Sequence, residues 1–168
     1  MMSRDRIGQG IDVHPLVENR PLVLGGVEIV FHLGLDGDTD GDVLSHAVMD
    51  ALLGAVALGD LGTHFHQGQP DVDGARSVRL LERVSGWIAQ EGYAIGNLDV
   101  TVVAQAPRLS PYTEAMRQTL AEAMAIQKSQ ISIKATTTDH LGMLGRSEGI
   151  MALATVLLHP LVEILEDS

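Results

Sequence analysis

The stretch DGDVLSHAVMDALLGAVALG (40–59) decides the fold class, because the pattern of the chain changes within it. From Val43 to Leu58 apolar side chains recur at three- and four-residue steps, which predicts a helix with a buried face. Asp42 directly precedes this run and belongs to the residue types that cap helix N-termini. We therefore expect the first helix of the chain to begin at Val43.

Strands and two further helices are predicted on either side of this helix. Upstream we expect a strand over 7–14 that ends at Pro15, two short strands within 21–31, and a glycine-rich acidic loop over 34–42. Downstream we expect a loop over 59–74, helices over 77–91 and 111–125, and strands over 98–106 and 131–135. The apolar segment 149–159 fits a buried strand or a buried helix equally well. Strands interleaved with three helices indicate an α/β (α+β layered) fold.

Length and composition exclude several classes of protein. The 168 residues form one expected domain, 1–168, and 45% are apolar, which is enough for a core. The net charge of −11 argues against nucleic acid or an anionic membrane as partner. The absence of cysteine excludes disulfides, thiol catalysis and cysteine-type zinc sites. No apolar stretch reaches 18 residues, and Met1–Ile7 lacks the apolar core of a signal peptide, so we expect a cytoplasmic protein without a membrane span.

The segment Asp12-Val13-His14 is the first candidate for chemistry. Residues two apart on a strand share a face, so the Asp12 carboxylate and the His14 imidazole can converge. His46 on the predicted helix would complete an open site of two histidines and one carboxylate, a known arrangement for catalytic zinc. Alternatively, Asp12 and His14 simply pair near a turn. Asp50, four residues after His46, either orients that imidazole or is a solvated helical residue.

Two further segments carry clustered polar residues. The acidic loop resembles a calcium loop in composition, but Ala47 occupies the position of the EF-hand's final glutamate, so a mobile loop over a site fits better. The segment Lys134–Asp139 places three threonines and a carboxylate after a predicted strand. These groups could hydrogen-bond phosphate oxygens and hold a divalent cation, or they could form an ordinary strand end and turn.

Taken together, five blocks of the chain resemble one family. They are IGQGIDVH (7–14), LGGV (24–27), DGDVLSHAVMDALLGAVALGDLG (40–62), GNLDVTVVAQAPRL (96–109) and IKATTTDHLGMLGRSEGI (133–150). In this order and spacing they resemble the 2-C-methyl-D-erythritol 2,4-cyclodiphosphate synthases. The resemblance implies a mixed β-sheet with three helices on one face, a strand over 149–159, and a homotrimer whose sheets pack around a three-fold axis, with active sites between subunits.

The resemblance also implies a reaction in the non-mevalonate route to isoprenoid precursors. In 4-diphosphocytidyl-2-C-methyl-D-erythritol 2-phosphate, the 2-phosphate attacks the β-phosphorus, CMP leaves, and the cyclic diphosphate forms. Zinc would be held by Asp12, His14 and His46, and a second divalent ion, magnesium or manganese, by Asp139. Thr137 would stabilise the transition state. The positions that match substrate-binding segments are Thr39, Asp60, Gly62, Phe65, Thr136, Thr138, Met143 and Arg146, and those that match the segment for cytidine and CMP are Ala104, Pro107, Arg108 and Leu109.

The chain departs from the family pattern at four places. His-Ser is usual where this chain has Asp38-Thr39, and that histidine contacts substrate phosphate. Phe-Pro-Asp is usual where Phe65-His66-Gln67 stands, glutamate is usual at Asp139, and phenylalanine is usual at Met143, near an axial cavity that can hold an isoprenoid diphosphate. An aspartate at position 38 would repel the substrate's phosphates.

These departures leave two alternatives to the synthase, which would be a metal-dependent phosphorus–oxygen lyase. The first is a trimer that binds metal and nucleotide in a regulatory role. The second is a zinc phosphohydrolase that places water in the open zinc position.

Overall fold

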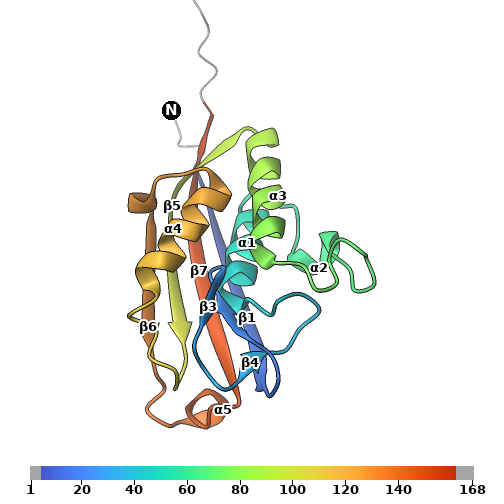
Figure 1. Ribbon diagram of the computed structural model, residues 1–168. Coiled ribbons are helices and arrows are strands. Elements are labelled where there is room, and N and C mark those ends of the chain that lie inside the picture. The colour runs from blue at the N-terminus through green and yellow to red at the C-terminus, as the bar shows by residue number, and fades with distance from the viewer. Residues whose placement is uncertain (1–4, 162–168) are drawn as a thin grey trace, which may run out of the picture.

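The computed structural model describes residues 5–161, and its centre is a five-stranded mixed sheet in the order β4-β1-β7-β5-β6 (Figure 1). The strands are β1 (Arg6–Val17), β4 (Gly34–Leu35), β5 (Tyr93–Val103), β6 (Ile131–Thr136) and β7 (Gly149–Pro160). β5 and β6 run parallel, and the other neighbours are antiparallel. β2 (Leu22–Leu24) and β3 (Val27–Ile29) form a separate hairpin. Most of the segment Met1–Ile7, which was not expected to be a signal peptide, and both ends of the predicted domain 1–168 lie outside the described residues.

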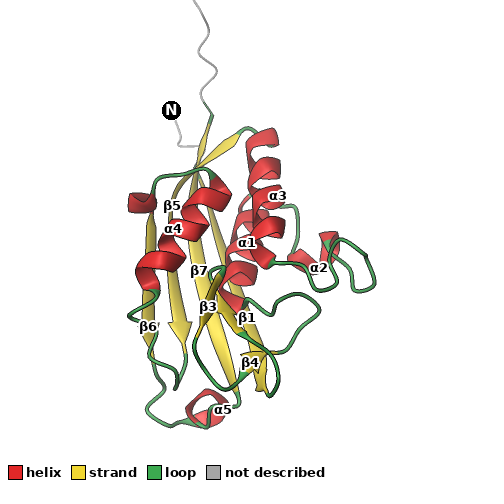
Figure 2. Ribbon diagram, in the orientation of Figure 1, coloured by secondary structure: helices red, strands yellow, loops and turns green. Residues whose placement is uncertain are grey.

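The long helices cover one face of this sheet (Figure 2). The three long ones are α1 (Val43–Ala55), α3 (Ser77–Gln90) and α4 (Thr113–Met124). The short ones are α2 (Leu61–His64), α5 (Gly142–Gly145) and the 3-10 turn η1 (Lys128–Gln130). The predicted mixed sheet with three helices on one face is therefore confirmed. Among residues 5–161, no helix is long and apolar enough to cross a membrane.

Helix α1 is buried on almost every side because it lies between the sheet and α3. It packs against β1 and β7 below and against α3 above. Its leucines, valines and alanines are nearly all inaccessible to solvent, and Leu44, Met49, Leu52 and Leu53 are fully buried. A helix that is apolar all round is expected only where it has neighbours on all sides.

Two glycines on β1 set the distance between α1 and the sheet. A Cβ atom on Gly8 would lie 1.8 Å from the carbonyl oxygen of Ala51, and one on Gly10 would lie 2.0 Å from that of Ala47. Real Cβ atoms do not approach so closely, so the helix backbone can rest on β1 only because these positions carry no side chain. Gly8 and Gly10 share a strand face, and that face continues to Asp12 and His14.

The buried carboxylate of Asp42 joins the start of α1 to the β2–β3 turn. It accepts hydrogen bonds from the backbone N–H groups of Gly25 at 2.9 Å, Gly26 at 2.7 Å and Ser45 at 3.0 Å, and from the Ser45 hydroxyl at 2.7 Å. The predicted N-cap is thus confirmed. Both glycines have positive φ, which explains why the turn of this hairpin consists of glycine.

Several predicted boundaries were wrong, each for a local reason. β1 continues through Pro15 to Val17 because Leu16 pairs with Leu35 of β4, a two-residue strand inside the predicted loop 34–42. α1 ends at Ala55 instead of Leu58, because Ala57 adopts a left-handed conformation and Leu58 N–H bonds back to Leu53. The apolar pattern of segment 149–159 did not distinguish a strand from a helix. The segment is a strand, as the resemblance to the family implied.

Three further boundaries differ from the sequence prediction. α2 forms inside the predicted loop 59–74, because Asp60 caps its first turn by accepting from the Thr63 N–H. β5 spans Tyr93–Val103 instead of 98–106, since its first residues pair with β7. α4 is one to two residues shorter at each end than the predicted 111–125.

A glycine-to-alanine pair tests the contact between helix and strand. Gly10→Ala should lower the free energy of unfolding by about 3 kcal/mol, because its Cβ would overlap a helix carbonyl. Gly54→Ala, on the exposed side of α1 with nothing within 4 Å of the new Cβ, should raise it by about 0.5–1 kcal/mol. Urea denaturation of both variants at one protein concentration gives the comparison. Equal effects at the two positions would contradict the packing argument.

Candidate metal centre and its pocket

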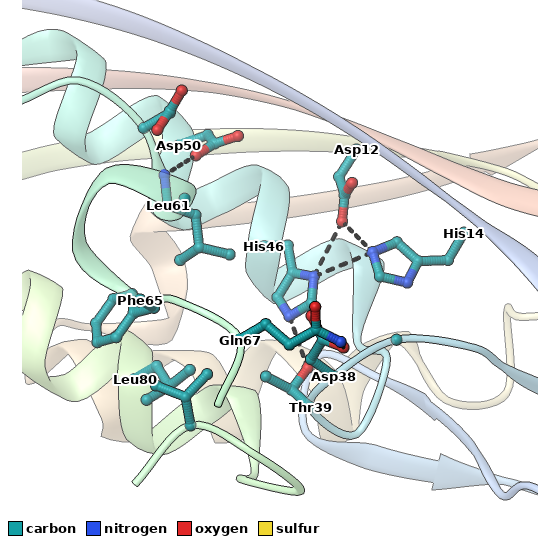
Figure 3. Close-up of a pocket in the computed structure, with 14 residues that line it drawn as sticks. Asp12, His14, Asp38, Thr39, His46, Asp50, Leu61, Phe65, Gln67 and Leu80 are labelled. Carbon is teal, nitrogen blue, oxygen red and sulfur yellow. Dashed lines mark hydrogen bonds and ion pairs between the residues drawn. The ribbon is translucent and has the colours of Figure 1, made fainter. Parts of the chain in front are cut away.

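Asp12, His14 and His46 converge on one point (Figure 3). Asp12 and His14 project from β1, and His46 lies in the first turn of α1. The Asp12 Oδ2 atom is 2.9 Å from Nε2 of His14 and 3.0 Å from Nδ1 of His46, and the two imidazole nitrogens are 3.4 Å apart. The predicted grouping of these three side chains is confirmed.

The three ligand atoms form a triangle of the size that a single zinc ion needs. Ligands at about 2.0–2.2 Å from a tetrahedral zinc are separated by roughly 3.3–3.6 Å, so small outward shifts would accommodate the ion. Two imidazoles and one carboxylate also match the donor set of catalytic zinc sites with one open position. The cluster borders a cavity of about 400 Å³, into which that position would open. The residues present therefore fit a divalent metal.

The loop 36–42 contacts both imidazoles on the side away from the common point, and the first residue of α3 also contacts His46. His14 Nδ1 contacts the carbonyl oxygen of Asp36. His46 Nε2 lies 3.0 Å from the Thr39 hydroxyl and 2.9 Å from the Ser77 hydroxyl. These contacts leave Nε2 of His14 and Nδ1 of His46 facing the common point, which fixes the nitrogen that each ring offers to a metal.

The electrostatics of the cluster favour a cation at its centre. Burial by itself would raise the pKa of Asp12, but hydrogen bonds and positive charge from the two histidines outweigh burial and hold that pKa well below its usual range. The Asp12 carboxylate in turn raises the pKa of His14, against the effect of desolvation. Without a metal, the Asp12 carboxylate thus favours the protonated form of the His14 imidazole. A divalent cation supplies the same positive charge and displaces that proton.

Asp50 does not hydrogen-bond to His46. The interpretation in which its carboxylate orients that imidazole is therefore wrong. The Asp50 carboxylate accepts a hydrogen bond of 2.7 Å from the N–H of Leu61, and burial raises its pKa. It therefore ties α1 to α2, while Thr39 and Ser77 contact the imidazole. Asp50 still lines the cavity, together with Asp38, Thr39, Asp60, Gly62, Phe65 and Gln67.

Two of the departures from the family pattern meet at this cavity. The Gln67 side-chain amide donates a hydrogen bond of 3.0 Å to the Asp38 carboxylate. The Asp38 carbonyl also accepts from Gly74 N–H at 2.7 Å. Asp38 therefore faces the cavity with its carboxylate held by the altered loop 65–69.

The aromatic ring of Phe65 anchors the same loop to α3. It stacks on Trp87 with ring centroids 5.6 Å apart and an interplanar angle of 16°. The guanidinium of Arg83 lies 4.9 Å from the Phe65 centroid and pairs with Asp71 at 2.8 Å. Phe65 also lines the metal pocket.

The remaining predicted site residues lie in other parts of the molecule. A second cavity of about 370 Å³ is lined by Ala104, Pro107, Arg108, Leu109, Thr136 and Thr137. A third, of about 280 Å³, includes Met143 and Glu148, and Glu148 pairs with Arg146 at 2.7 Å. Asp139 has positive φ, and its N–H donates to the Thr137 hydroxyl at 3.2 Å, while the Thr138 hydroxyl donates to Leu141. Within one chain, the cavity of about 370 Å³ contains no residue of the metal cluster, whereas the cavity that includes Met143 is also lined by His14.

The residues that support the two histidines were not predicted from the sequence. Ser77 was expected only as the start of a helix, and the Asp36 contact uses a backbone carbonyl, which no side-chain pattern reveals. Arg20 was assigned no role, although its guanidinium donates hydrogen bonds to three residues of the acidic loop, Asp36, Gly37 and Thr39. The acidic loop was the only sequence feature that could have pointed to such partners. Clustered carboxylates need cationic groups or N–H donors when they are partly buried.

Fold and site together define an α/β protein with a candidate divalent-metal centre at the contact between a strand and a helix. The chain belongs to the YgbB family, whose model matches residues 5–159. It is 53% identical over 153 residues to the 2-C-methyl-D-erythritol 2,4-cyclodiphosphate synthase of Bacillus subtilis, covering 91% of this chain and 97% of that one. It is 54% identical over 157 residues to the synthase of Synechococcus elongatus, covering 94% and 98%.

Solved structures agree with this assignment. The IspF of Plasmodium falciparum, in a CDP complex, has a TM-score of 0.82 at 33% identity, over 95% of this chain and 99% of that one. The bifunctional IspDF of Campylobacter jejuni has a TM-score of 0.90 at 38% identity. This chain is similar to 43% of the length of that bifunctional protein, and the match covers 95% of this chain.

Two histidine-to-alanine variants, one at a ligand and one outside the cavity, test the metal centre. His46→Ala should weaken zinc binding by more than the roughly 10–100-fold that loss of an outer partner costs, because a direct ligand is removed. His32→Ala changes an exposed histidine outside the cavity and should leave zinc binding unaltered. Metal analysis after equilibration with a zinc buffer measures both. Full zinc in the His46 variant would contradict the assignment.

Proposed function

We propose that this chain is a 2-C-methyl-D-erythritol 2,4-cyclodiphosphate synthase. It would convert 4-diphosphocytidyl-2-C-methyl-D-erythritol 2-phosphate to the cyclodiphosphate and CMP, as a phosphorus–oxygen lyase of isoprenoid precursor synthesis in the cytoplasm. The observation that carries the proposal is the intact Asp12–His14–His46 cluster, in a chain more than half identical to synthases over nearly their whole length.

The proposed reaction is intramolecular, so the protein's main tasks are to position the phosphates and to neutralise their charge. Asp12, His14 and His46 would hold zinc, which when bound supplies Lewis-acid polarisation of a phosphoryl oxygen. Asp139 would hold a second divalent ion, magnesium or manganese. The Thr137 hydroxyl would donate a hydrogen bond to a phosphate oxygen as negative charge develops on it.

The substrate's organic parts would bind in the metal pocket and in the cavity of about 370 Å³. The methylerythritol moiety would lie near Asp60, Gly62 and Phe65, in the metal pocket. The cytidine and its phosphate would lie in the cavity that contains Ala104, Pro107, Arg108 and Leu109. The solved relative in a CDP complex supports a cytidine nucleotide as the ligand.

The proposal includes a homotrimer with sites between subunits. Two observations support it. Ile7, Ile11 and Val13 on β1 are exposed by 74%, 54% and 45% of their surface, which is costly unless a partner covers them. The metal pocket and the cavity of the cytidine segment are also separate within one chain, so a neighbouring copy could bring them together. Met143 and Arg146 would then border an axial cavity suited to an isoprenoid diphosphate. A monomer mass by light scattering at micromolar concentration would contradict this arrangement.

One experiment separates the synthase from its alternatives. The purified chain is incubated with the diphosphocytidyl substrate, zinc and magnesium, and the products are followed by phosphorus NMR. Cyclodiphosphate and CMP in equal amounts are expected. Linear phosphate products would indicate a phosphohydrolase, and tight binding without turnover would indicate a regulatory trimer; either result would overturn the proposal.

Asp38 is expected to limit turnover without affecting the fold. Its carboxylate faces the pocket, where negative charge opposes charge accumulation on the phosphates. Asp38→His should raise turnover about 10–100-fold, which corresponds to roughly 1.4–2.7 kcal/mol of transition-state stabilisation. Asp38→Asn, which removes the charge and can still accept from Gln67, should give a smaller rise.

Steady-state kinetics of the three proteins at fixed zinc and magnesium provides the measurement for Asp38. Zinc content and melting temperature should not change. If the histidine variant is equally active or slower, Asp38 does not act against the phosphates.

A further inference from the structure

Arg20 binds the acidic loop through three acceptors. It lies in the turn between β1 and β2, and its guanidinium donates to the Asp36 carboxylate at 3.0 Å, to the Gly37 carbonyl at 2.8 Å and to the Thr39 carbonyl at 2.6 Å. Only 28% of the side chain is exposed. A planar guanidinium can span such a set of acceptors because its N–H groups form a rigid fork.

The segment that Arg20 holds is the one that contacts both histidines. The Asp36 carbonyl meets Nδ1 of His14, and the Thr39 hydroxyl lies 3.0 Å from Nε2 of His46. Between them, the backbone of Gly37 lies against the His14 ring, since a Cβ at that position would be 2.8 Å from the ring's Cε1 atom. A shift of this segment would therefore move the partners of both imidazoles at once.

Other hydrogen bonds also hold the loop. Asp36 N–H donates to the Pro15 carbonyl at 3.0 Å, the Asp38 carbonyl accepts from Gly74 N–H at 2.7 Å, and Asp40 N–H donates to the Ala75 carbonyl at 3.0 Å. Arg20 adds contacts to Asp36, Gly37 and Thr39, on both sides of Asp38. It also brings a positive charge to a seven-residue run that carries four aspartates, 36–42.

We propose that Arg20 is a positioning residue of the metal centre. It fixes the Asp36 carbonyl and the Thr39 hydroxyl, which hold the two imidazoles in the orientation that a metal requires. This inference rests on the proposed function in one respect: it takes Asp12, His14 and His46 as the zinc site. A residue that only stabilised the turn would affect folding and leave zinc affinity unchanged.

Loss of an outer partner of a metal-binding histidine commonly weakens metal binding 10–100-fold. Arg20→Ala removes the clamp on two such partners, so we expect zinc affinity to fall about 10-fold or more. Arg20→Lys keeps the charge but replaces the fork by a single ammonium group, so its affinity should lie between those of the wild type and the alanine variant. Arg79→Ala is the matched control, because Arg79 is 71% exposed and pairs with Glu82 on the surface of α3.

The experiment compares these four proteins by chelator competition for zinc. The visible absorption of bound cobalt serves as a second readout that is independent of activity, because it reports ligand geometry. Melting temperatures of the metal-free proteins show whether each variant is folded. The expected result is the affinity order wild type, Arg20→Lys, Arg20→Ala, with Arg79→Ala equal to wild type and an altered cobalt spectrum only in the Arg20 variants.

The outcomes separate this inference from the proposed function. A folded Arg20→Ala variant with wild-type zinc affinity and cobalt spectrum would overturn the positioning role and leave the metal site standing. If Arg20→Ala does not fold, the same criterion applies to Arg20→Lys. Wild-type zinc affinity and cobalt spectrum in that variant would overturn the positioning role. A wild-type chain that takes up neither zinc nor cobalt would overturn the metal site, and this inference with it.

Discussion

The structure depends on the direct contact between the backbone of α1 and strand β1 at Gly8 and Gly10. Because no side chains separate them there, the helix lies closer to the sheet than it could on any other residue type. The next two inward positions of the strand are Asp12 and His14, which reach past the end of the contact to the first turn of the helix. His46 is in that turn, so the close packing also determines the geometry of the metal cluster.

The acidic loop shows how one short run of aspartates is divided among different tasks. Asp42 is fully buried and caps α1, and Asp40 accepts from the Ser77 N–H at 3.1 Å. Asp36 pairs with Arg20, and Asp38 faces the metal pocket. A calcium loop would direct these carboxylates toward one ion. Here each carboxylate has a separate partner, so the loop is a scaffold behind the two histidines.

The sequence predicted those parts of the molecule that follow from local periodicity. The spacing of Asp12 and His14 indicated a common strand face, and the pattern after Asp42 placed His46 on a helix. Contacts between loops could not be predicted in this way. Arg20 and Ser77 carry no motif, and their roles depend on how two irregular segments meet. The end of α1 could not be predicted from the sequence either, because Ala57 adopts a left-handed conformation that its residue type disfavours.

The stacking of Phe65 on Trp87 has a practical consequence. Trp87 is the only tryptophan in the chain, and its stacking partner forms part of the wall of the metal pocket. The emission of an indole depends on the groups in contact with its ring, so a displacement of Phe65 changes the environment of the single indole. The protein therefore contains an intrinsic optical probe of its own pocket, and no label has to be attached near the site.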